Sequence, residues 1–167
     1  MDDSQATSQP QPERPGMRDY GISSAEQGML PWSWVDERME AARNYWVCTV
    51  RPDGRPHAAP VWGLWLDSRF YFGTSPRSVK GRNLEHNPAV VLHLESGDET
   101  VIMEGVVEQV QDASVLSRIA RDYTQKYDIE LDVEDANSPL FVIIPQRVFA
   151  WTEQDYPSSA TRFRLDG

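Results

Sequence analysis

Tight-turn signals divide the stretch between Tyr45 and Val110 into short apolar segments, and this pattern constrains the fold most strongly. Residues 45–50 are aromatic or β-branched on both faces, which is typical of a strand buried on two sides. Arg51-Pro52-Asp53-Gly54 follows, where proline presets the first central position of a turn and glycine tolerates positive φ. Consecutive strands joined by such turns favour an antiparallel sheet.

Further strands are expected on both sides of one long helix. Pro60 is unusual inside a central strand, so we expect a bulge there, or a strand edge that meets something other than a neighbouring strand. Gly105 predicts a bulge or bend, and Pro145 separates two predicted strands. The expected strands cover residues 56–66, 69–74, 89–95, 100–110, 140–144, 147–153 and 161–165.

Three helices are expected. The first runs from a Ser33 cap to residue 44, with Asp36 completing a weaker capping box. A short helix covers residues 78–86 and ends before Asn87-Pro88, since the residue before proline avoids helical angles. The third has apolar residues at helical spacing and precedes an acidic loop at residues 128–138. Its spaced residues are Leu116, Ile119, Ala120, Tyr123 and Tyr127.

Together, these strands and helices predict a mainly β fold with flanking helices (α+β). The strands are expected to close into a small antiparallel Greek-key or meander barrel of about six to eight strands. Residues 29–167 form one domain, and residues 1–20 are expected to be a disordered tail because they are polar and proline-rich. A dinucleotide fold is excluded, because no GxGxxG follows a strand and there is no P-loop.

Composition excludes several functions. The formal net charge of −10, from 16 basic and 26 acidic side chains, argues against nucleic acid or an anionic membrane as partner. No apolar stretch approaches the roughly 18–20 residues that span a bilayer, and the polar N-terminus lacks a secretory core, so a cytoplasmic protein is expected. Cys48 is the only cysteine and is expected to be a buried, inert thiol. The three histidines lack ligand spacing, so no metal site is expected.

The segment from Thr74 to Leu84 joins a strand to a helix start and carries three cations among hydroxyl residues. Unpaired N–H groups at a helix N-terminus favour an anion. Lys80, one of only two lysines, adds a point charge, and Arg77 can grip two phosphate oxygens. The segment therefore indicates a phosphate site; the alternative is a capped surface helix with solvated cations.

A second candidate covers residues 56–65, where small residues precede aromatic ones and could form a flat apolar slot. Trp62 and Trp65 fall on opposite faces of a strand, so one could be core and the other could line a site. The alternative is that both only pack in the core. No catalytic triad is recognisable and no catalytic residue is assigned. If the chain is an enzyme, the hard chemistry is therefore expected to belong to a cofactor.

The runs NYWVCTVRPDGRPHAAPVWGLWL, RFYFGTSPRSVKGRNLEHNPAVVLHLE and VIMEGVVEQV resemble the pyridoxamine 5′-phosphate oxidase-like superfamily of FMN-binding split β-barrels. Within it, the chain is most similar to the actinobacterial flavin/deazaflavin-dependent oxidoreductases. The resemblance covers roughly residues 30–151 and rests on a Ser-x-Lys-x-x-Asn-Leu loop followed by Asn-Pro and a strand. It implies a split barrel that forms a homodimer, with the cofactor in a groove at the subunit interface.

The resemblance also implies roles for individual residues. Asn83 would support the phosphate loop, and Trp151 would close the groove from the second subunit. Either His57 or solvent would supply a proton. The phosphate would be held by Thr74, Ser75, Arg77, Ser78 and Lys80, and the ring would face Ala59, Pro60, Val61 and Trp62.

The implied reaction is hydride transfer between bound FMN or the deazaflavin coenzyme F-420 and a small conjugated substrate, which the protein positions. The subfamily favours F-420, whose anionic tail would suit extra cations such as Arg55, Arg82 and Arg147. One alternative is an FMN-dependent oxidase of the pyridoxamine phosphate oxidase type, although its pyridoxal phosphate-binding and C-terminal motifs are not evident. Others are a non-catalytic flavin-binding or storage protein, and a structural dimer with an empty groove.

Overall fold

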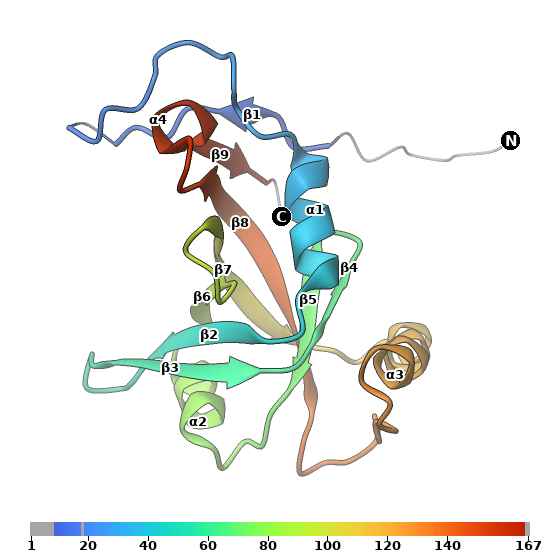
Figure 1. Cartoon of the computed structure of the whole chain (residues 1–167). Helices are drawn as coiled ribbons and strands as arrows, with labels where there is room; N and C mark the ends of the chain where they lie inside the picture. Colours follow the sequence, from blue (N-terminus) through green and yellow to red (C-terminus); the bar gives the residue numbers. More distant parts are fainter. Residues whose placement is uncertain (1–8, 18, 166–167) are drawn as a thin grey trace, which may run out of the picture.

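The computed structural model describes residues 9–17 and 19–165. These residues form a mainly antiparallel β structure flanked by helices (Figure 1). The elements up to the middle of the chain are β1 (Pro12–Glu13), α1 (Trp32–Ala41), β2 (Tyr45–Val50), β3 (Pro56–Val61), β4 (Leu64–Leu66), β5 (Arg69–Gly73) and α2 (Val79–His86). The later ones are β6 (Ala89–His93), β7 (Glu99–Gln109), α3 (Ala113–Tyr127), β8 (Leu140–Thr152), α4 (Tyr156–Ser159) and β9 (Thr161–Arg164).

The strands follow the hydrogen-bonded order β1-β9-β8-β7-β6-β2-β3, and every pair is antiparallel. Strand β8 belongs to two parts of the sheet: residues 140–143 pair with β5 of the β4–β5 hairpin, and residues 147–150 pair with β9. Along its other edge β8 pairs with β7 over its whole length. Because β8 is shared in this way, the barrel is split. The expected mainly β, antiparallel split barrel is therefore confirmed. The two ends of the strand path, β1 and β3, do not pair with each other, so the sheet is open.

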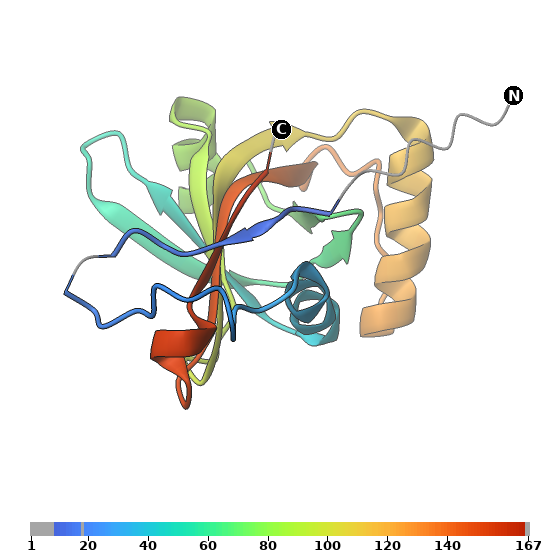
Figure 2. The same cartoon turned by 90° about the horizontal axis from the view of Figure 1, so that it is seen from above.

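The core lies inside the curved sheet. Alternate residues of β2 point inward, so Tyr45 and Val47 are fully buried, and the Tyr45 ring packs 4.5 Å from that of Phe70. A smaller apolar cluster of Leu64, Ile119 and Leu140 lies under α3. Figure 2 shows α3 beside β4, outside the sheet. No described helix is long and apolar enough to cross a membrane.

A bulge lies where β7 pairs with β8. The register changes from Glu104 opposite Arg147 to Gly105 opposite Pro145, so Gln146 is the extra residue. A Cβ on Gly105 would stand 2.2 Å from the carbonyl oxygen of Ile144, so the close approach requires glycine. This confirms the bulge expected at Gly105. It also corrects the two strands expected around Pro145, because a residue without an N–H is tolerated at a bulge and β8 continues through it.

Two further boundaries differ from expectation. Helix α1 begins at Trp32 with Pro31 at its N-cap, so Ser33 lies inside the first turn and makes no capping hydrogen bond. The strand expected over residues 56–66 is divided at Trp62 and Gly63 into β3 and β4. A Cβ on Gly63 would lie 2.3 Å from the Phe70 ring, so the close approach of the chain to β5 at this break requires glycine. Pro60 lies on β3, the edge strand of the path, as one alternative predicted.

Part of the segment expected as a disordered tail is anchored. Strand β1 pairs with β9, and the Arg14 guanidinium donates to carbonyl oxygens of Ala25, Gln27, Ser158 and Ala160 at 2.5–2.9 Å. Residues 1–8 and 18 of that segment lie outside the described residues. The anchoring partners are more than ten residues away in sequence, so local composition does not reveal them.

Candidate functional site

The loop between β5 and α2 is held by its own hydroxyl groups. Ser78 caps α2, since its Oγ accepts from the Gly81 N–H at 3.0 Å. The hydroxyls of Thr74 and Ser78 are 3.0 Å apart, and Thr74 is buried. Ser75 Oγ accepts from the Arg77 N–H at 3.2 Å. These contacts fix the loop around the first turn of α2 before any ligand is present.

Gly81 allows the loop to lie directly on the helix. A Cβ at this position would stand 2.2 Å from the Ser75 carbonyl oxygen and 2.9 Å from Pro76 Cα. Any side chain would therefore push the loop off the N-terminus of α2. The result is a compact turn at a helix N-terminus, where the first N–H groups have no acceptor within the helix, an arrangement that favours an anion.

Positive charge collects at this loop without carboxylate partners. Arg77 and Arg82 are exposed and Lys80 is partly exposed. Among the described residues, none of the three takes part in an ion pair. Arg82 donates to the carbonyl oxygen of Arg77, which ties one cation to the loop backbone. In a chain of net charge −10, this uncompensated group is the feature that an anion would neutralise.

A buried polar chain supports the loop from behind. Asn83 Nδ2 donates to Thr49 Oγ1 at 2.9 Å, and the same oxygen lies 3.5 Å from His57 Nδ1. The pKa of His57 is lowered, first by burial and then by the positive charges of Arg51 and Lys80. Asn83 therefore connects α2 to β2 rather than facing outward. Thr49 was not singled out from the sequence, where it is one β-branched residue in an apolar strand.

Strand β3 offers a backbone edge. Among the described strands it pairs only with β2, in a register that places Pro60 opposite Trp46. Because proline cannot donate, and hydrogen-bonded pairs alternate along an antiparallel ladder, the Ala58 N–H faces the open edge. Of the residues expected to face a ring, Pro60 is exposed, Ala59 is half-buried and Val61 is buried. The edge thus presents backbone more than side chains.

The two tryptophans after β3 have different environments. Trp65 is core, and its Nε1 donates to Asp36 Oδ1 at 2.8 Å. Trp62 is 36% exposed and stacks on Tyr127 with ring centroids 4.8 Å apart and planes at 9°. One core and one exposed tryptophan agree with the first alternative from the sequence, although the break at Gly63, rather than strand alternation, separates them.

The family model described as pyridoxamine 5′-phosphate oxidase matches residues 35–152, which include the loop, β3 and most of the sheet. The chain belongs to the pyridoxamine 5′-phosphate oxidase family. A curated pyridoxine/pyridoxamine 5′-phosphate oxidase of Azorhizobium caulinodans is 44% identical over 70 residues, covering 40% of this chain and 33% of that protein. The chain thus matches only 33% and 42% of the lengths of the first two curated relatives.

Solved structures of this family's fold are also similar. A conserved hypothetical protein of Mycobacterium tuberculosis superposes with a TM-score of 0.65 at 24% identity, covering 74% of this chain and 85% of its own. An F-420 reductase superposes with a TM-score of 0.56 at 25% identity, covering 68% of this chain and 94% of its own. Heme-binding proteins share the fold as well. The fold alone therefore does not select the cofactor.

Trp151, expected in the family's cofactor groove, does not join the other candidate residues within one chain. It lies on β8, and β7, β6 and β2 separate that strand from β3. Its ring packs edge-on against Tyr156, with centroids 5.6 Å apart.

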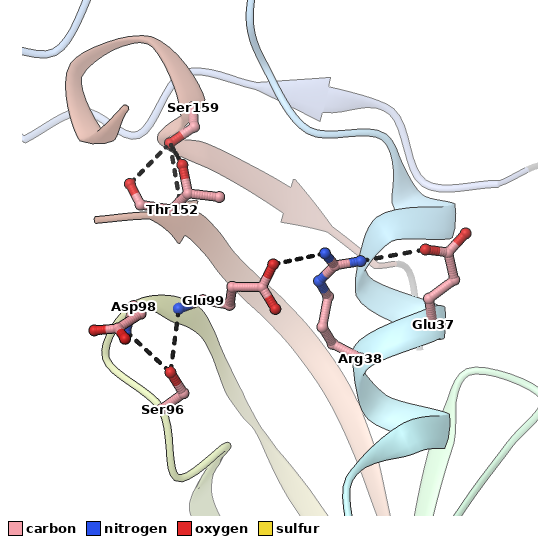
Figure 3. Close-up of polar contacts among 7 residues, drawn as sticks. All are labelled: Glu37, Arg38, Ser96, Asp98, Glu99, Thr152 and Ser159. Atoms are coloured by element: carbon pink, nitrogen blue, oxygen red, sulfur yellow. Dashed lines mark hydrogen bonds and ion pairs between the residues drawn. The ribbon is translucent and has the colours of Figure 1, made fainter. Parts of the chain in front are cut away.

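A separate hollow of about 460 Å³ has the opposite charge. It is lined by Asp98, Glu99, Thr152, Glu153 and Gln154. Figure 3 shows Arg38 between Glu37 and Glu99, with which it forms ion pairs of 3.2 and 2.7 Å, and Ser96 accepting a hydrogen bond from the Asp98 N–H. Its carboxylates would repel a phosphorylated cofactor, so the β5–α2 loop remains the candidate site.

Proposed function

We propose that this protein is an oxidoreductase that binds FMN or the deazaflavin F-420 and transfers hydride between the cofactor ring and a small conjugated substrate. The observation that carries this is the preformed β5–α2 loop, with its unpaired cations, next to the open edge of β3. The family and the F-420 reductase among the similar structures support it.

The chain's residues would bind and orient rather than react. The N-terminal N–H groups of α2 and Lys80 would hold the phosphate, since both supply positive charge where Ser78 closes the loop. Strand β3 would border the ring with backbone groups, including the Ala58 N–H. The contact of Nδ1 with Thr49 Oγ1 would orient the His57 ring and leave Nε2 as the nitrogen that can pass a proton to the substrate, with solvent as the alternative donor. The bound cofactor supplies the hydride chemistry.

Charge around the loop informs the choice of cofactor. Of the arginines expected for an anionic tail, Arg55 is paired with Asp53 at 2.7 Å and Arg147 with Glu104 at 2.8 Å. Only Arg82 of the three lacks an ion pair among the described residues. We keep F-420 as the favoured cofactor because of the subfamily resemblance, with FMN as the alternative that shares the ribityl phosphate.

The outer sheet face supports a homodimer with the cofactor at its interface. Trp46, His93, Ile102 and Phe149 form one cross-strand row, alternating with buried neighbours, and all four are only half-buried. Cys48 and Val91 occupy the next row, so Cys48 is half-buried on this face rather than in the core. Burial still raises the pKa of its thiol, which disfavours a thiolate nucleophile. A second copy covering this face would remove apolar area from water and supply its Trp151.

The test is cofactor titration of the cofactor-free full-length chain, followed by calorimetry and by the absorbance of each cofactor. We expect saturable binding, weakened about 10- to 150-fold in Lys80→Met, because a hydrogen bond to a charged group contributes about 1.5–3 kcal/mol. Arg121→Gln, an exposed ion-pair residue on α3, is the matched control and should bind as the wild type does. Absence of binding by both cofactors, or equal affinity in Lys80→Met, would overturn the proposal.

A second measurement separates the enzyme from a storage protein. The reduced, protein-bound cofactor is mixed with conjugated acceptors such as enones and quinones, and its reoxidation is followed without oxygen. An oxidoreductase should accelerate reoxidation over free cofactor by at least tenfold for one acceptor class. Binding without acceleration would favour the non-catalytic flavin-binding alternative.

A further inference from the structure

A second group of cations without carboxylate partners lies at the opposite end of β3 from the phosphate loop. Arg43 precedes β2, and Lys126 lies near the end of α3. In Figure 1, α2 lies below β2 and β3, whereas α3 lies beyond the C-terminal end of β3. Strand β3 spans six residues, or about 17 Å at the usual rise, so this group is distinct from the loop around Lys80.

An aromatic stack carries both cations. The Trp62 and Tyr127 rings are nearly parallel, and the Arg43 guanidinium lies 4.9 Å from the Trp62 centroid and 5.4 Å from that of Tyr127. The Lys126 ammonium lies 5.3 Å from the Tyr127 centroid and 4.9 Å from that of Tyr45. Both positive charges therefore border the Tyr127 ring, and they come from two segments far apart in sequence.

The stack is rigid before any ligand binds. Trp62 Nε1 donates to Asn44 Oδ1 at 3.1 Å, and Tyr127 Oη accepts from the Gly63 N–H at 3.0 Å. The break at Gly63 turns Trp62 outward and leaves part of its indole in contact with solvent. A flat apolar surface with fixed orientation is thus available next to the strand that would border the cofactor ring.

The two cations lack compensation by negative charge. Among the described residues, neither Arg43 nor Lys126 forms an ion pair. Lys126 Nζ donates to Tyr45 Oη at 2.7 Å and Gly63 O at 3.3 Å, which leaves one ammonium proton for another acceptor. Burial and the nearby Arg43 lower the pKa of Lys126 to about 8. The other titratable groups around it are Tyr45, Tyr123 and Tyr127, with Glu40 acting on Tyr45.

We propose that Trp62, Arg43 and Lys126 bind a planar conjugated carboxylic acid, whose π system stacks on the indole and whose carboxylate neutralises the two cations. The proposal rests on the proposed function, because it names the substrate class of that reaction: conjugated acids rather than neutral enones. A carboxylate suits the pair, since a guanidinium binds it in two-pronged fashion and an ammonium adds a point charge.

The experiment uses the cofactor-free full-length chain and two probes of equal shape, trans-cinnamate and trans-cinnamamide, in calorimetric titrations at pH 7. Cinnamate should bind at least tenfold more tightly than the amide, because only cinnamate carries the charge. Arg43→Gln and Lys126→Met should each weaken cinnamate binding at least fivefold and leave amide binding within twofold. Arg121→Gln is the control. Equal affinity for both probes, or unchanged cinnamate affinity in both variants, would overturn the proposal.

A pH series adds a readout that a purely structural role of Lys126 would not give. Cinnamate affinity should fall as the pH rises through about 8, where free Lys126 loses its proton. Lys126→Arg keeps a cation and a donor to Tyr45, so its cinnamate affinity should stay flat up to pH 9.5. A flat profile in the wild type would contradict the role assigned to Lys126.

Two further arms separate this proposal from others. Tetraglutamate tests whether the cations hold a polyanionic cofactor tail instead. If tetraglutamate displaced bound cinnamate at a concentration lower than that of the cinnamate, the substrate assignment would be overturned. Lys80→Met should retain cinnamate affinity, and Arg43→Gln should retain cofactor affinity within twofold. If the wild type bound neither cofactor, the proposed function would be rejected. If it bound a cofactor but not cinnamate, only this inference would be rejected.

Discussion

Asn83 on α2 donates from Nδ2 to Thr49 Oγ1 on β2 at 2.9 Å, and both side chains are buried. This contact joins the helix that presents the candidate phosphate site to the strand that pairs with β3. This buried polar pair therefore helps to set the position of the loop relative to the edge of β3. Its removal is expected to affect both stability and cofactor binding.

Asn83→Leu tests that contact with a side chain of similar size. The substitution leaves Thr49 Oγ1 with only the 3.5 Å contact to His57, and we expect a loss of about 1–3 kcal/mol in the free energy of unfolding. Urea denaturation measures it. Asn137→Ala, in the exposed loop before β8, should change stability by less than about 0.5 kcal/mol. Equal stability of the two variants would show that the pair is not a determinant of the fold.

Gly105→Ala tests the bulge. The new Cβ would stand 2.2 Å from the backbone oxygen of Ile144, which cannot move without shifting β8. We expect destabilisation by more than about 3 kcal/mol, at the upper end for single substitutions. Gly97→Ala is the matched control, because a Cβ there meets nothing within 4 Å and its φ is ordinary. Thermal unfolding of the two variants should separate them clearly; similar midpoints would disprove the steric requirement.

The pKa of Lys126 predicts a pH dependence of stability. Its folded pKa of about 8 lies below the ordinary value of 10.5, so between these values the unfolded chain binds more protons at this residue. The contribution of Lys126 to the free energy of unfolding should therefore rise with pH from about 8 to 10.5. Denaturation of the wild type and Lys126→Met is measured from pH 7 to 9.5, below tyrosine ionisation. The free energy of unfolding of the wild type should increase relative to that of the variant as the pH rises. A constant difference would contradict it.

Ile102→Arg tests the proposed dimer. The charge would be placed in the middle of the half-buried row on the outer sheet face, where covering it by a second copy would be unfavourable. Wild-type protein should sediment near 38 kDa, twice 19.0 kDa, and the variant as a monomer. Gln125→Arg, on the exposed side of α3, should leave the dimer intact. A wild-type monomer at micromolar concentration, or a dimeric Ile102→Arg, would exclude this face.

Local features were predictable wherever one residue's own conformation decides the structure. The strand at residues 45–50, the turn at Gly54 with its φ of 84°, and α2 after the Ser78 cap all agree with expectation. The bulge at Gly105 agrees as well. The loop that forms the candidate phosphate site belongs to this class, because a cap, a proline and a helix start lie within a few residues of one another.

Other features depend on contacts between distant segments. Pro145 suggested a strand break, yet its pairing with Gly105 keeps β8 continuous. Lys126 lies among aromatic rings because residues 43–45 and the end of β3 approach α3, and its own helix does not reveal this environment. Arg14 lies in the segment expected to be a disordered tail, but its guanidinium donates hydrogen bonds to the carbonyl oxygens of Ser158 and Ala160 at α4.

The sequence by itself determined the strand-and-turn order, the capped α2 loop and the family, since turn angles, caps and apolar alternation act over a few residues. Only the tertiary structure decided which cations remain without carboxylate partners and which tryptophan faces outward. Those outcomes depend on distances between segments that are far apart along the chain. The overall negative charge therefore says little about the candidate anion site, because it does not reveal that two small groups of cations without an ion pair among the described residues flank β3.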